Sequence, residues 1–551
     1  MAAFLKNIPV KGCFIFLFLL CFHSNTQAQN YTIVLGRPTD SAITISILFD
    51  QNADYYFKYG TQTGNYPNTT SGYVAAAGMP DERNLSGLIS NTKYYYKVYY
   101  KASGASNYLV SNEYSFQTCR AKGSTFTFTL EADEHLYDKK GVQNMYRVTL
   151  ANEAADKPDF MMTLGDIFGD DHTPNTTNNF EMDSLHKAYR PFLGSICHSV
   201  PFYVCLGNHE GEKKYYLLKN PPNNIAVYGT LARKKYYPNP YPNEFYTGNT
   251  NAELFGMGTP ENYYAWTWGD ALFVVLDAYR DDNDTTPKPH GWDWTLGLPQ
   301  YTWLKNTLEG STAKYKFVFA HHISGENRGG KLVAPLNEWG GYQTVGGQYN
   351  FPTYRPGWAK PIHQLFVDNK VNIFFQGHDH LYAHEELDNV VYQEVPMAAD
   401  STYNIGMLAN ADAYTKDTLE GTGHIRVTVS PDCIQVDFVR AYLPADTVGG
   451  KHRNGEIGLT YKLGACASSG INNLNSLQQL TVYPNPAMDE IHWTIPDNSS
   501  LISANLFNLN GQELLKTTTN TLDVSSLANG IYILKLEAVS EIISRKIVIS
   551  R

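Results

Sequence analysis

Five short segments of the sequence place Asp, Asn or His directly after a run of mainly apolar residues. In VNIFFQGHDHLYAHEE, the run 371–375 is followed by Gly377, His378, Asp379 and His380. Such a run predicts a strand that is buried on both faces, and the glycine lets the chain turn sharply as it leaves the sheet. Open α/β sheets bind ligands just beyond the carboxyl ends of their strands. The segment therefore predicts chemically useful side chains at a strand end.

The same construction recurs in FTFTLEADEH, DFMMTLGDIFGDD, PFYVCLGNHE and YKFVFAHH. These four segments contribute Asp133, His135, Asp166, Asp170, Asn208, His209, Glu210, His321 and His322. A lone His is more often structural than a ligand. Five such strand ends are hard to explain by packing, because clustered carboxylates and imidazoles without a counter-charge would be strongly destabilising. A metal centre supplies that counter-charge.

The candidate ligands are carboxylate, carboxamide and imidazole groups without any cysteine, a set that fits Zn, Fe or Mn. There are seven of them: Asp133, His135, Asp166, Asn208, His321, His378 and His380. Seven ligands exceed what one such ion normally takes. Two ions that share one carboxylate, ~3.5 to 4 Å apart, would satisfy them.

The bulk composition indicates an ordered protein of several domains. A chain of 551 residues is too long for one core, since single cores stop growing near ~250 to 300 residues. Its 40 tyrosines, 43 glycines and 27 prolines suit globular domains rich in strands and ordered loops. A net charge of -10 argues against a general nucleic-acid surface, because binding to phosphate backbones needs clustered Lys and Arg. We therefore expect no nucleic-acid partner, and any anionic substrate must be held locally.

The first 28 residues have the pattern of a secretory signal peptide. Lys6 and Lys11 precede an apolar stretch, 13–22, and small residues follow at Thr26 and Ala28. The stretch is shorter than the ~20 residues of a membrane anchor, and no later segment resembles one. A lipid anchor at Cys21 is disfavoured because the large residue Leu20 precedes it. We expect a cleaved signal and a secreted or cell-surface protein.

Five of the 7 cysteines lie beyond the predicted signal: Cys119, Cys197, Cys205, Cys433 and Cys466. An odd number cannot all pair. Cys197 and Cys205 are close enough in sequence to bridge in an oxidising compartment, but isolated buried thiols are the favoured interpretation for most of the five.

Three segments follow the predicted signal. Residues 29–120 alternate apolar and polar positions in short strands and predict a β-sandwich. NLSGLISNTKYYYKVYY and EYSFQT resemble the fibronectin type III-like domain that precedes the catalytic domain of purple acid phosphatases. Residues 123–463 alternate strands, helices and long loops, as an α/β domain does. Residues 464–479 are predicted to be a polar linker.

The last segment, 480–551, predicts a second small β-sandwich. It contains VYPNP, a central NG turn and GIYILKL in that order, and so resembles the C-terminal sorting domain of type IX secretion cargo. That resemblance implies the type IX machinery as a partner and export through the periplasm. An ordinary carbohydrate-binding or spacer sandwich is the alternative.

The order DxH, GD, GNHE, H and GHxH resembles the calcineurin-like metallophosphoesterases, and with the first sandwich the purple acid phosphatase branch. The resemblance implies two mixed β-sheets flanked by helices. It implies that Asp133, His135 and His380 hold one metal ion, that Asn208, His321 and His378 hold a second, and that Asp166 bridges them.

The implied chemistry is attack on phosphorus by a metal-bound hydroxide, as in phosphate monoester hydrolysis by acid phosphatases. His209 would protonate the leaving alkoxide or stabilise the phosphoryl group; its alternative is a hydrogen bond that orients the loop. Purple acid phosphatases have a metal-binding tyrosine where this chain has Gly169. His135 offers a ligand in its place, and iron is therefore not assured.

Several other residues have two interpretations. His322 could replace His321 as a ligand, but a role in substrate contact is favoured. Asp277 could be an eighth ligand, but a structural hydrogen bond is favoured. Arg328 and Arg355 could grip a phosphate oxygen or be solvated at the surface. Asp170 and Asp171 are interpreted either as partners of a histidine ligand or as exposed turn residues.

The sequence thus favours an exported two-metal phosphatase acting on a small phosphorylated substrate. A phosphodiesterase or nucleotidase of the same superfamily is the first alternative. A non-catalytic surface binding protein with a vestigial metal site is the second.

Overall fold

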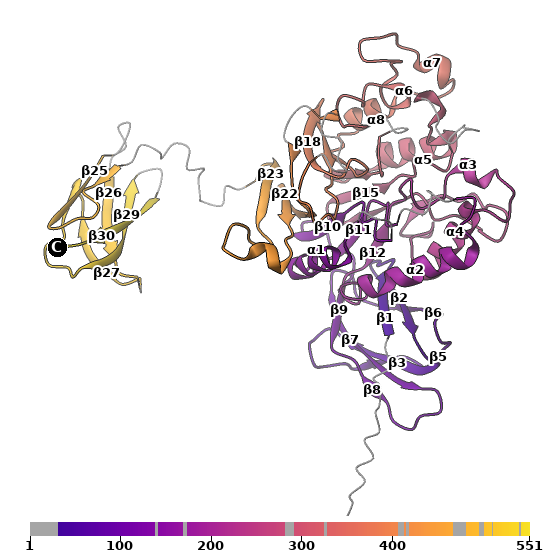
Figure 1. Ribbon diagram of the computed structural model, residues 1–551, viewed down its shortest axis with the longest axis horizontal. Helices are drawn as coiled ribbons and strands as arrows, with labels where there is room; N and C mark the ends of the chain where they lie inside the picture. Colours follow the sequence, from indigo (N-terminus) through magenta and orange to yellow (C-terminus); the bar gives the residue numbers. More distant parts are fainter. Residues whose placement is uncertain are drawn as a thin grey trace, which may run out of the picture. The chain divides into compact units, whose positions relative to one another are not determined.

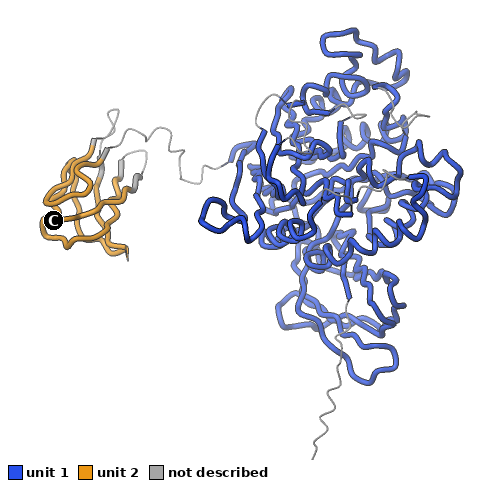
Figure 2. Tube along the Cα trace, viewed as in Figure 1, with its two compact units in different colours: residues 1–466 blue, residues 467–551 orange. Residues whose placement is uncertain are grey.

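The computed structural model describes residues 31–137, 141–168, 174–281, 291–323, 328–405, 413–414, 418–466, 481–494, 501–509, 511–538 and 542–551. The chain divides into two compact units, 1–466 and 467–551 (Figure 2). The predicted signal peptide lies outside the described residues, as does the predicted linker beyond Cys466. Within the described ranges, no helix is both long and apolar enough to cross a membrane.

The first unit begins with a β-sandwich, as predicted. Its smaller sheet is antiparallel and contains β1 (Tyr31–Gly36), β2 (Ala42–Phe49) and β6 (Pro80–Ser86). Its larger sheet contains β3 (Ala53–Gly60), β4 (Asn68–Thr69), β5 (Tyr73–Ala75), β7 (Lys93–Ala102), β8 (Leu109–Val110) and β9 (Tyr114–Gln117). Alternate residues of β7 are buried, and they pack with Ile45 and Ile47 of β2 in one core between the sheets. Period-two alternation therefore identified this region correctly.

Two larger sheets form the centre of the unit. The six-stranded sheet has the order β12-β11-β10-β21-β22-β23. Its strands are β10 (Phe126–Glu131), β11 (Phe160–Thr163), β12 (Phe202–Val204), β21 (Gly423–Ser430), β22 (Cys433–Arg440) and β23 (Ile457–Gly464). Strands β10, β11 and β12 pair in parallel, whereas β21 to β23 join antiparallel.

The eight-stranded sheet has the order β13-β14-β15-β16-β17-β19-β18-β20. Its strands are β13 (Thr247–Gly248), β14 (Tyr264–Trp268), β15 (Ala271–Val275), β16 (Tyr315–Phe319), β17 (Ile373–Gln376), β18 (Tyr382–Leu387), β19 (Val390–Glu394) and β20 (Thr418–Leu419). Strands β15, β16, β17 and β19 run parallel.

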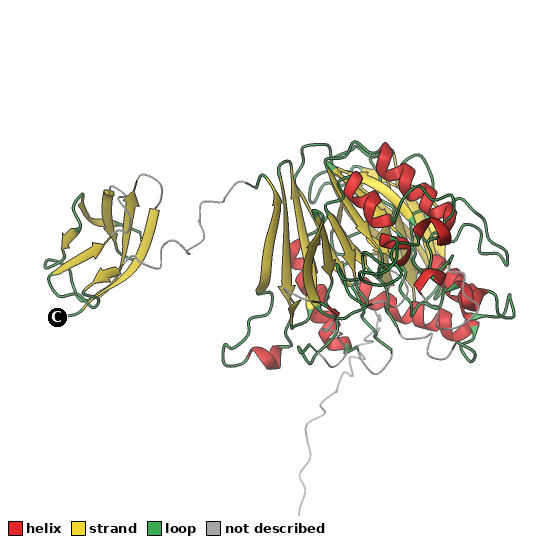
Figure 3. Ribbon diagram, turned by 90° about the horizontal axis from the view of Figure 1, so that it is seen from above, coloured by secondary structure: helices red, strands yellow, loops and turns green. Residues whose placement is uncertain are grey.

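The two sheets stack face to face and helices cover their outer faces (Figures 1 and 3). Phe128, Phe160, Phe273 and Phe317 belong to the core between the sheets. The first sheet packs outside against α1 (Gln143–Asp156), α2 (Asn179–Leu193) and α4 (Ile225–Tyr236). The second packs against α5 (Gly297–Gly310), α6 (Asn337–Gly340) and α8 (Ile362–Asp368). Short helices lie in the loops: α3 (Lys214–Leu217), α7 (Phe351–Tyr354), η2 (Gly291–Asp293) and η4 (Pro444–Thr447). The predicted central fold of two mixed sheets is confirmed.

The second unit is a small β-sandwich, as predicted. One sheet contains β24 (Thr481–Tyr483), β25 (Glu490–Thr494) and β28 (Thr521–Asp523). The other contains β26 (Leu501–Phe507), β27 (Glu513–Thr517), β29 (Gly530–Ala538) and β30 (Ile542–Ile549). Trp493, Leu506 and Leu534 belong to the core that joins the sheets.

The cysteines differ from one expectation. Cys197 and Cys205 are buried free thiols, so the bridge considered between them is wrong. A disulfide joins Cys433 to Cys466 instead. Cys433 pairs with Gly464 in the β22–β23 hairpin, and this register brings the two sulfurs together although 33 residues separate them. Cys119 is also free, which agrees with isolated thiols for most of the five.

Candidate metal centre

The pairing of the strands brings the five predicted segments to one place. Asp133, Asp166 and Asn208 follow the parallel neighbours β10, β11 and β12. His321 and His378 follow the parallel neighbours β16 and β17 of the other sheet. Parallel strands end at the same sheet edge, so each sheet presents its polar side chains together. The stacked sheets then place the two sets face to face.

Asp133, His135 and His380 form one group that could hold a cation, with ligand atoms all within 4.8 Å of one another. Nε2 of His380 lies 3.3 Å from Oδ1 of Asp133 and 3.2 Å from Nε2 of His135. Oδ1 of Asp133 is buried and accepts no hydrogen bond from the described residues. A carboxylate oxygen in that position is poorly satisfied unless a cation joins the group.

Asn208, His321 and His378 converge beside the first group. Oδ1 of Asn208 lies 2.8 Å from Nδ1 of His378 and 3.1 Å from Nε2 of His321. The other ring nitrogen of His321, Nδ1, lies 2.8 Å from the carbonyl oxygen of Leu164. Because a carbonyl only accepts, this Nδ1 is the donor and Nε2 faces the cluster. Second hydrogen bonds of this kind orient histidine ligands at metal sites.

Asp166 lies between the two groups. Its Oδ2 is 3.1 Å from Nε2 of His321 and 3.9 Å from Nε2 of His135. Asp166 forms one possible ligand group with His321 and His378 and another with His135 and His209. A carboxylate shared in this way is suited to bridge two cations.

Two groups of the cluster, Asp166 and His378, have the charge that suits a metal ligand. Burial would raise the pKa of Asp166, but His321 and His209 outweigh it and hold this pKa well below its ordinary value. Burial, together with His322 and His321, lowers the pKa of His378 well below its ordinary value. A carboxylate that stays charged and an imidazole that stays neutral are the forms that bind metal. The residues present therefore fit two metal ions.

The backbone of the cluster is strained. Positive φ angles occur at Asp133 (56°), His135 (44°), Asp166 (60°), His378 (77°) and His380 (61°). Residues other than glycine rarely adopt this left-handed conformation, which persists only where surrounding contacts hold it. Here the carboxylates provide them, since Asp133 accepts the backbone N–H of His378 at 2.9 Å and Asp166 accepts that of His209 at 2.8 Å.

Gly377 has a different task from the predicted one. The left-handed turn is at His378, and Gly377 itself has no positive φ. A Cβ at Gly377 would lie 2.7 Å from Oδ2 of Asp133. The glycine is therefore required because the backbone approaches a ligand carboxylate closely.

Glu210, which the sequence analysis left without a role, supports the bridging aspartate. Its carboxylate accepts backbone N–H groups of Gly207 at 2.6 Å, Ile167 at 2.8 Å and Asp166 at 3.1 Å. It thus ties the loop after β12 to the loop after β11. The signal in the sequence was its place in the GNHE motif.

Sequence reasoning also missed the anchor of the GHxH loop. Asp379 accepts hydrogen bonds from Tyr414 Oη at 2.7 Å and from the backbone of Gly329 at 2.9 Å, and it pairs with Arg328 at 3.1 Å. Glu394 accepts the backbone N–H of Asp379 at 3.0 Å, and one of its carboxyl oxygens lies 2.9 Å from Oη of Tyr414. These contacts hold the residue between His378 and His380. The signal was a carboxylate in the apolar strand VVYQE.

The residues proposed to touch substrate lie in different surroundings. His322 is buried, with its ring centroid 4.3 Å from that of His378 and 6.0 Å from that of Tyr279. Arg328 is partly exposed and donates to the carbonyl of His378 at 3.2 Å. His209 keeps 13% of its side chain exposed, and its Nε2 lies 3.8 Å from Oδ2 of Asp166. All three border the cluster.

The structure corrects the phosphate-binding role considered for Arg355. Its guanidinium is buried, pairs with Glu338 at 2.6 Å, and donates to the carbonyls of Trp292 and Trp294 at 2.7 and 2.9 Å. It fastens loops together and is not placed to bind phosphate. No local sequence pattern distinguishes Arg355 from a solvent-facing arginine, because the carbonyls that accept its hydrogen bonds lie in loops.

Asp277 has the favoured structural role. It accepts hydrogen bonds from Asn262 at 2.7 Å and from the backbone of Tyr279 at 2.8 Å. Gly169, Asp170 and Asp171 lie outside the described residues.

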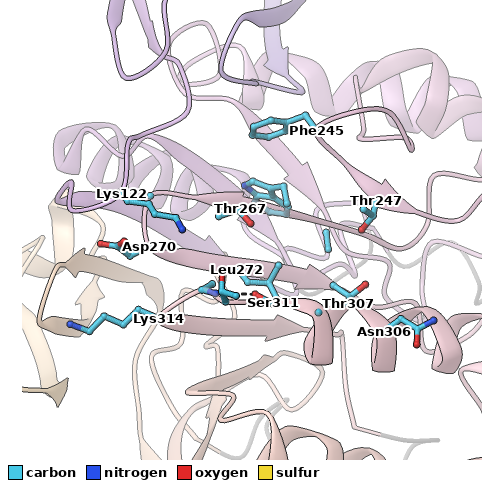
Figure 4. Close-up of a pocket in the computed structure, with 16 residues that line it drawn as sticks. Lys122, Phe245, Thr247, Thr267, Asp270, Leu272, Asn306, Thr307, Ser311 and Lys314 are labelled. Carbon is cyan, nitrogen blue, oxygen red and sulfur yellow. Dashed lines mark hydrogen bonds between the residues drawn. The ribbon is translucent and has the colours of Figure 1, made fainter.

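A cavity of about 590 Å³ lies away from the cluster (Figure 4). Asp270 and Lys314 line it just before the first residues of β15 and β16, whereas His321 comes two residues after the end of β16. Asn306 and Thr307 of α5 also line the cavity (Figure 4). The cavity is therefore at the opposite edge of the sheet from the candidate ligands.

Comparison with known families agrees with the motifs. Residues 127–382 match the family model described as calcineurin-like phosphoesterase. Residues 481–550 match the model described as secretion system C-terminal sorting domain.

Two curated relatives are purple acid phosphatases 7 and 3 of Arabidopsis thaliana, each 22% identical. The matches cover 41% and 45% of this chain, and the chain spans only 55% and 56% of the relatives' own length.

Solved structures show the same fold. The structure of PhoD has a TM-score of 0.54 at 15% identity, covering 79% of this chain and 90% of that chain. A purple acid phosphatase from yellow lupin (Lupinus luteus) seeds has a TM-score of 0.52 at 15% identity, covering 79% and 74%.

Proposed function

We propose that this chain, whose residues 127–382 match the family model described as calcineurin-like phosphoesterase, is an exported phosphatase that hydrolyses phosphate monoesters at a two-metal centre. The observation that carries the proposal is the convergence of ligand-type side chains from five strand ends, with Asp166 shared between groups. The metal ions are Zn, Fe or Mn, the metals that carboxylate, carboxamide and imidazole ligands suit.

Each ligand has a proposed place. Asp133, His135 and His380 would hold one ion, Asn208, His321 and His378 would hold the other, and Asp166 would contribute to both. When bound, the ions would activate water as a nucleophile and offset charge on the phosphoryl oxygens. The protein contributes a buried site in which Glu210 and Asp379 fix the ligand loops before any substrate arrives.

His209 is the proposed proton donor to the leaving oxygen. Its backbone N–H donates to Asp166, which fixes the residue beside the bridging carboxylate. Its side chain is 13% exposed, whereas that of Asp166 is 1% exposed, so a leaving group near His209 would have a path to solvent. His322 and Arg328 are proposed to contact the phosphate, which gives a protein of net charge -10 a local means to hold an anion.

Monoester preference rests on the likeness to purple acid phosphatases, and a phosphodiesterase or nucleotidase is the alternative. The protein loaded with Zn, Mn or Fe is expected to bind about two ions and to release phosphate from an aryl phosphate. Asp166→Ala should lose both properties, whereas the exposed control Asp432→Ala should keep them. Activity on a phosphodiester but not on a monoester would favour a phosphodiesterase. A protein that binds no metal would favour the non-catalytic surface binding protein.

Export is proposed through the periplasm by the predicted signal peptide and then by the type IX machinery. The match of residues 481–550 to a sorting domain supports this route. Removal of residues 480–551 should leave hydrolysis intact and strand the protein in the periplasm. Secretion that persists after the deletion would overturn this part of the proposal.

A further inference from the structure

The first sandwich carries a regular pattern of lysine and tyrosine on its outer face. Along β7, Lys93, Tyr95, Lys97, Tyr99 and Lys101 alternate with residues buried in the core. On the neighbouring strand β3, Tyr56 lies opposite Tyr99 and Lys58 lies opposite Lys97. We call Tyr56, Lys58, Lys97, Tyr99, Lys101 and Tyr108 the Lys–Tyr face. Figure 1 shows β3, β7 and β8 on the side of the sandwich away from α2.

The rings of this face pack on one another. Tyr56 and Tyr99 stack with centroids 5.0 Å apart and planes 10° apart. Tyr108 meets Tyr56 edge-on at 5.2 Å. Nζ of Lys58 lies 5.0 Å from the centre of the Tyr99 ring, and Nζ of Lys101 lies 5.1 Å from that of Tyr108. The face therefore offers ammonium groups, phenol hydroxyls and ring edges to a ligand, rather than open aromatic faces.

The charge of this face opposes that of the whole chain. Three lysines of the Lys–Tyr face, with Lys93 beside them, are accompanied by two carboxylates. Asp54 lies 3.7 Å from Lys101, and Glu113 interacts electrostatically with Lys97, so lysine remains in excess. The chain as a whole has a net charge of -10. A local excess of lysine creates a positive potential that attracts anions, although the protein as a whole is acidic.

The pattern continues into a cavity. Lys93, at the start of β7, lines a space of about 350 Å³ that also has Gln117, Lys157 and His198 in its wall. From Lys93 to Lys101 the strand extends roughly 27 Å. An extended, repeating anion could therefore contact lysines from this cavity to the far end of the face.

We propose that the Lys–Tyr face binds an acidic polysaccharide. Lysine ammonium groups would pair with its carboxylates, phenol hydroxyls would hydrogen-bond to its sugar hydroxyls, and ring edges and lysine stems would contact its C–H surfaces. Single-stranded nucleic acid fits less well, because sequence-tolerant binding of bases uses open ring faces. At Tyr56 and Tyr99 these faces cover each other.

The competing explanation is that cross-strand pairs of this kind only stabilise the sheet. That explanation predicts effects on unfolding but no ligand. It predicts that replacing the lysines of the face with neutral residues changes no binding, so binding measurements separate the two explanations.

The experiment measures binding of polygalacturonate to the full chain by calorimetry, with uncharged dextran and single-stranded DNA as comparison ligands. The variant Lys58→Gln/Lys97→Gln/Lys101→Gln should weaken polygalacturonate binding at least about tenfold. The matched control Lys305→Gln/Lys314→Gln/Lys360→Gln removes three lysines that pair with Glu309, Asp432 and Asp368 elsewhere, and it should bind within about twofold of the parent.

Raising the salt concentration should weaken binding, because the contacts are exposed charges. Dextran should bind far more weakly than polygalacturonate. Failure of polygalacturonate to bind, equal loss in both triple variants, or tighter binding of DNA would overturn the proposal. Phosphate release should be the same in the parent and both variants, so this test is independent of the proposed hydrolysis.

Discussion

The two edges of the eight-stranded sheet differ: one carries the candidate metal ligands, and the other carries a cavity. At the edge where β16 and β17 end, the side chains are of ligand type, are buried except for the half-buried His380, and are held on left-handed backbone at His378 and His380. At the opposite edge, a glycine takes the left-handed turn, with φ 59° at Gly269, and Lys314 pairs with Asp432 across 2.8 Å. The cavity of about 590 Å³ is at this second edge. Strain borne by non-glycine residues, not cavity volume, marks the candidate centre.

Two glycines test this difference most strongly. Gly377→Ala would drive a Cβ toward Oδ2 of Asp133, 2.7 Å away. Metal affinity and phosphate release are expected to fall roughly 100-fold, the upper range for disturbance around metal ligands. Gly310→Ala, which lines the cavity and meets nothing within 4 Å, should leave both unchanged. Metal titration and turnover measure the effect, and equal behaviour of the two variants would remove the distinction between the edges.

His186 lies outside the cluster, so its protonation is expected to change the stability of the fold and not the candidate metal ligands. Burial lowers the pKa of His186 from 6.5 to about 3, so the folded protein binds this proton less readily than the unfolded chain. Stability from the neutral ring is present above pH 6.5 and is lost as the pH falls toward 3. At pH 5 this amounts to roughly 2 kcal/mol relative to pH 7.

His186→Phe should therefore lose less unfolding free energy between pH 7 and pH 5 than the parent, by about 2 kcal/mol. Denaturant unfolding at both values measures the difference. The ring contact with Phe168, 4.9 Å between centroids, should be retained. Parallel pH curves for parent and variant would show that His186 does not carry this acid sensitivity.

The smallest effect is expected at the anchor of the GHxH loop. Tyr414→Phe removes a hydroxyl that donates to Asp379 at 2.7 Å and should lower metal affinity about tenfold. Tyr403→Phe is the control, since that hydroxyl donates to Asp446 at 2.8 Å, in a loop away from the cluster. Isothermal titration with Zn measures both. Equal affinity in the two variants would mean that Asp379 keeps its position without Tyr414.

The sequence allowed the ligand residues to be proposed because each follows a recognisable strand, as Asp133 follows FTFTLE. It also predicted both small sandwiches from period-two alternation. It did not reveal which strands pair, so the Cys433–Cys466 bridge was missed and a bridge at Cys197 was considered instead. The role of Arg355 was wrong for a similar reason, because its partners are loop carbonyls that no local pattern identifies.

Contacts that support the cluster were equally hidden. Glu394 and Tyr414 are distant in sequence from Asp379, and only the β17–β19 pairing and a loop contact bring them to it. Short sequence motifs identify the residues that jointly bind a ligand. They do not record the residues that hold those motifs in an unfavourable backbone conformation.

The most direct test of the account is anomalous diffraction from crystals of the metal-loaded protein. We predict two peaks ~3.5 to 4 Å apart, one beside Asp133, His135 and His380, the other beside Asn208, His321 and His378, with Asp166 between them. A single peak would contradict the account. Two peaks that do not have Asp166 between them would also contradict it.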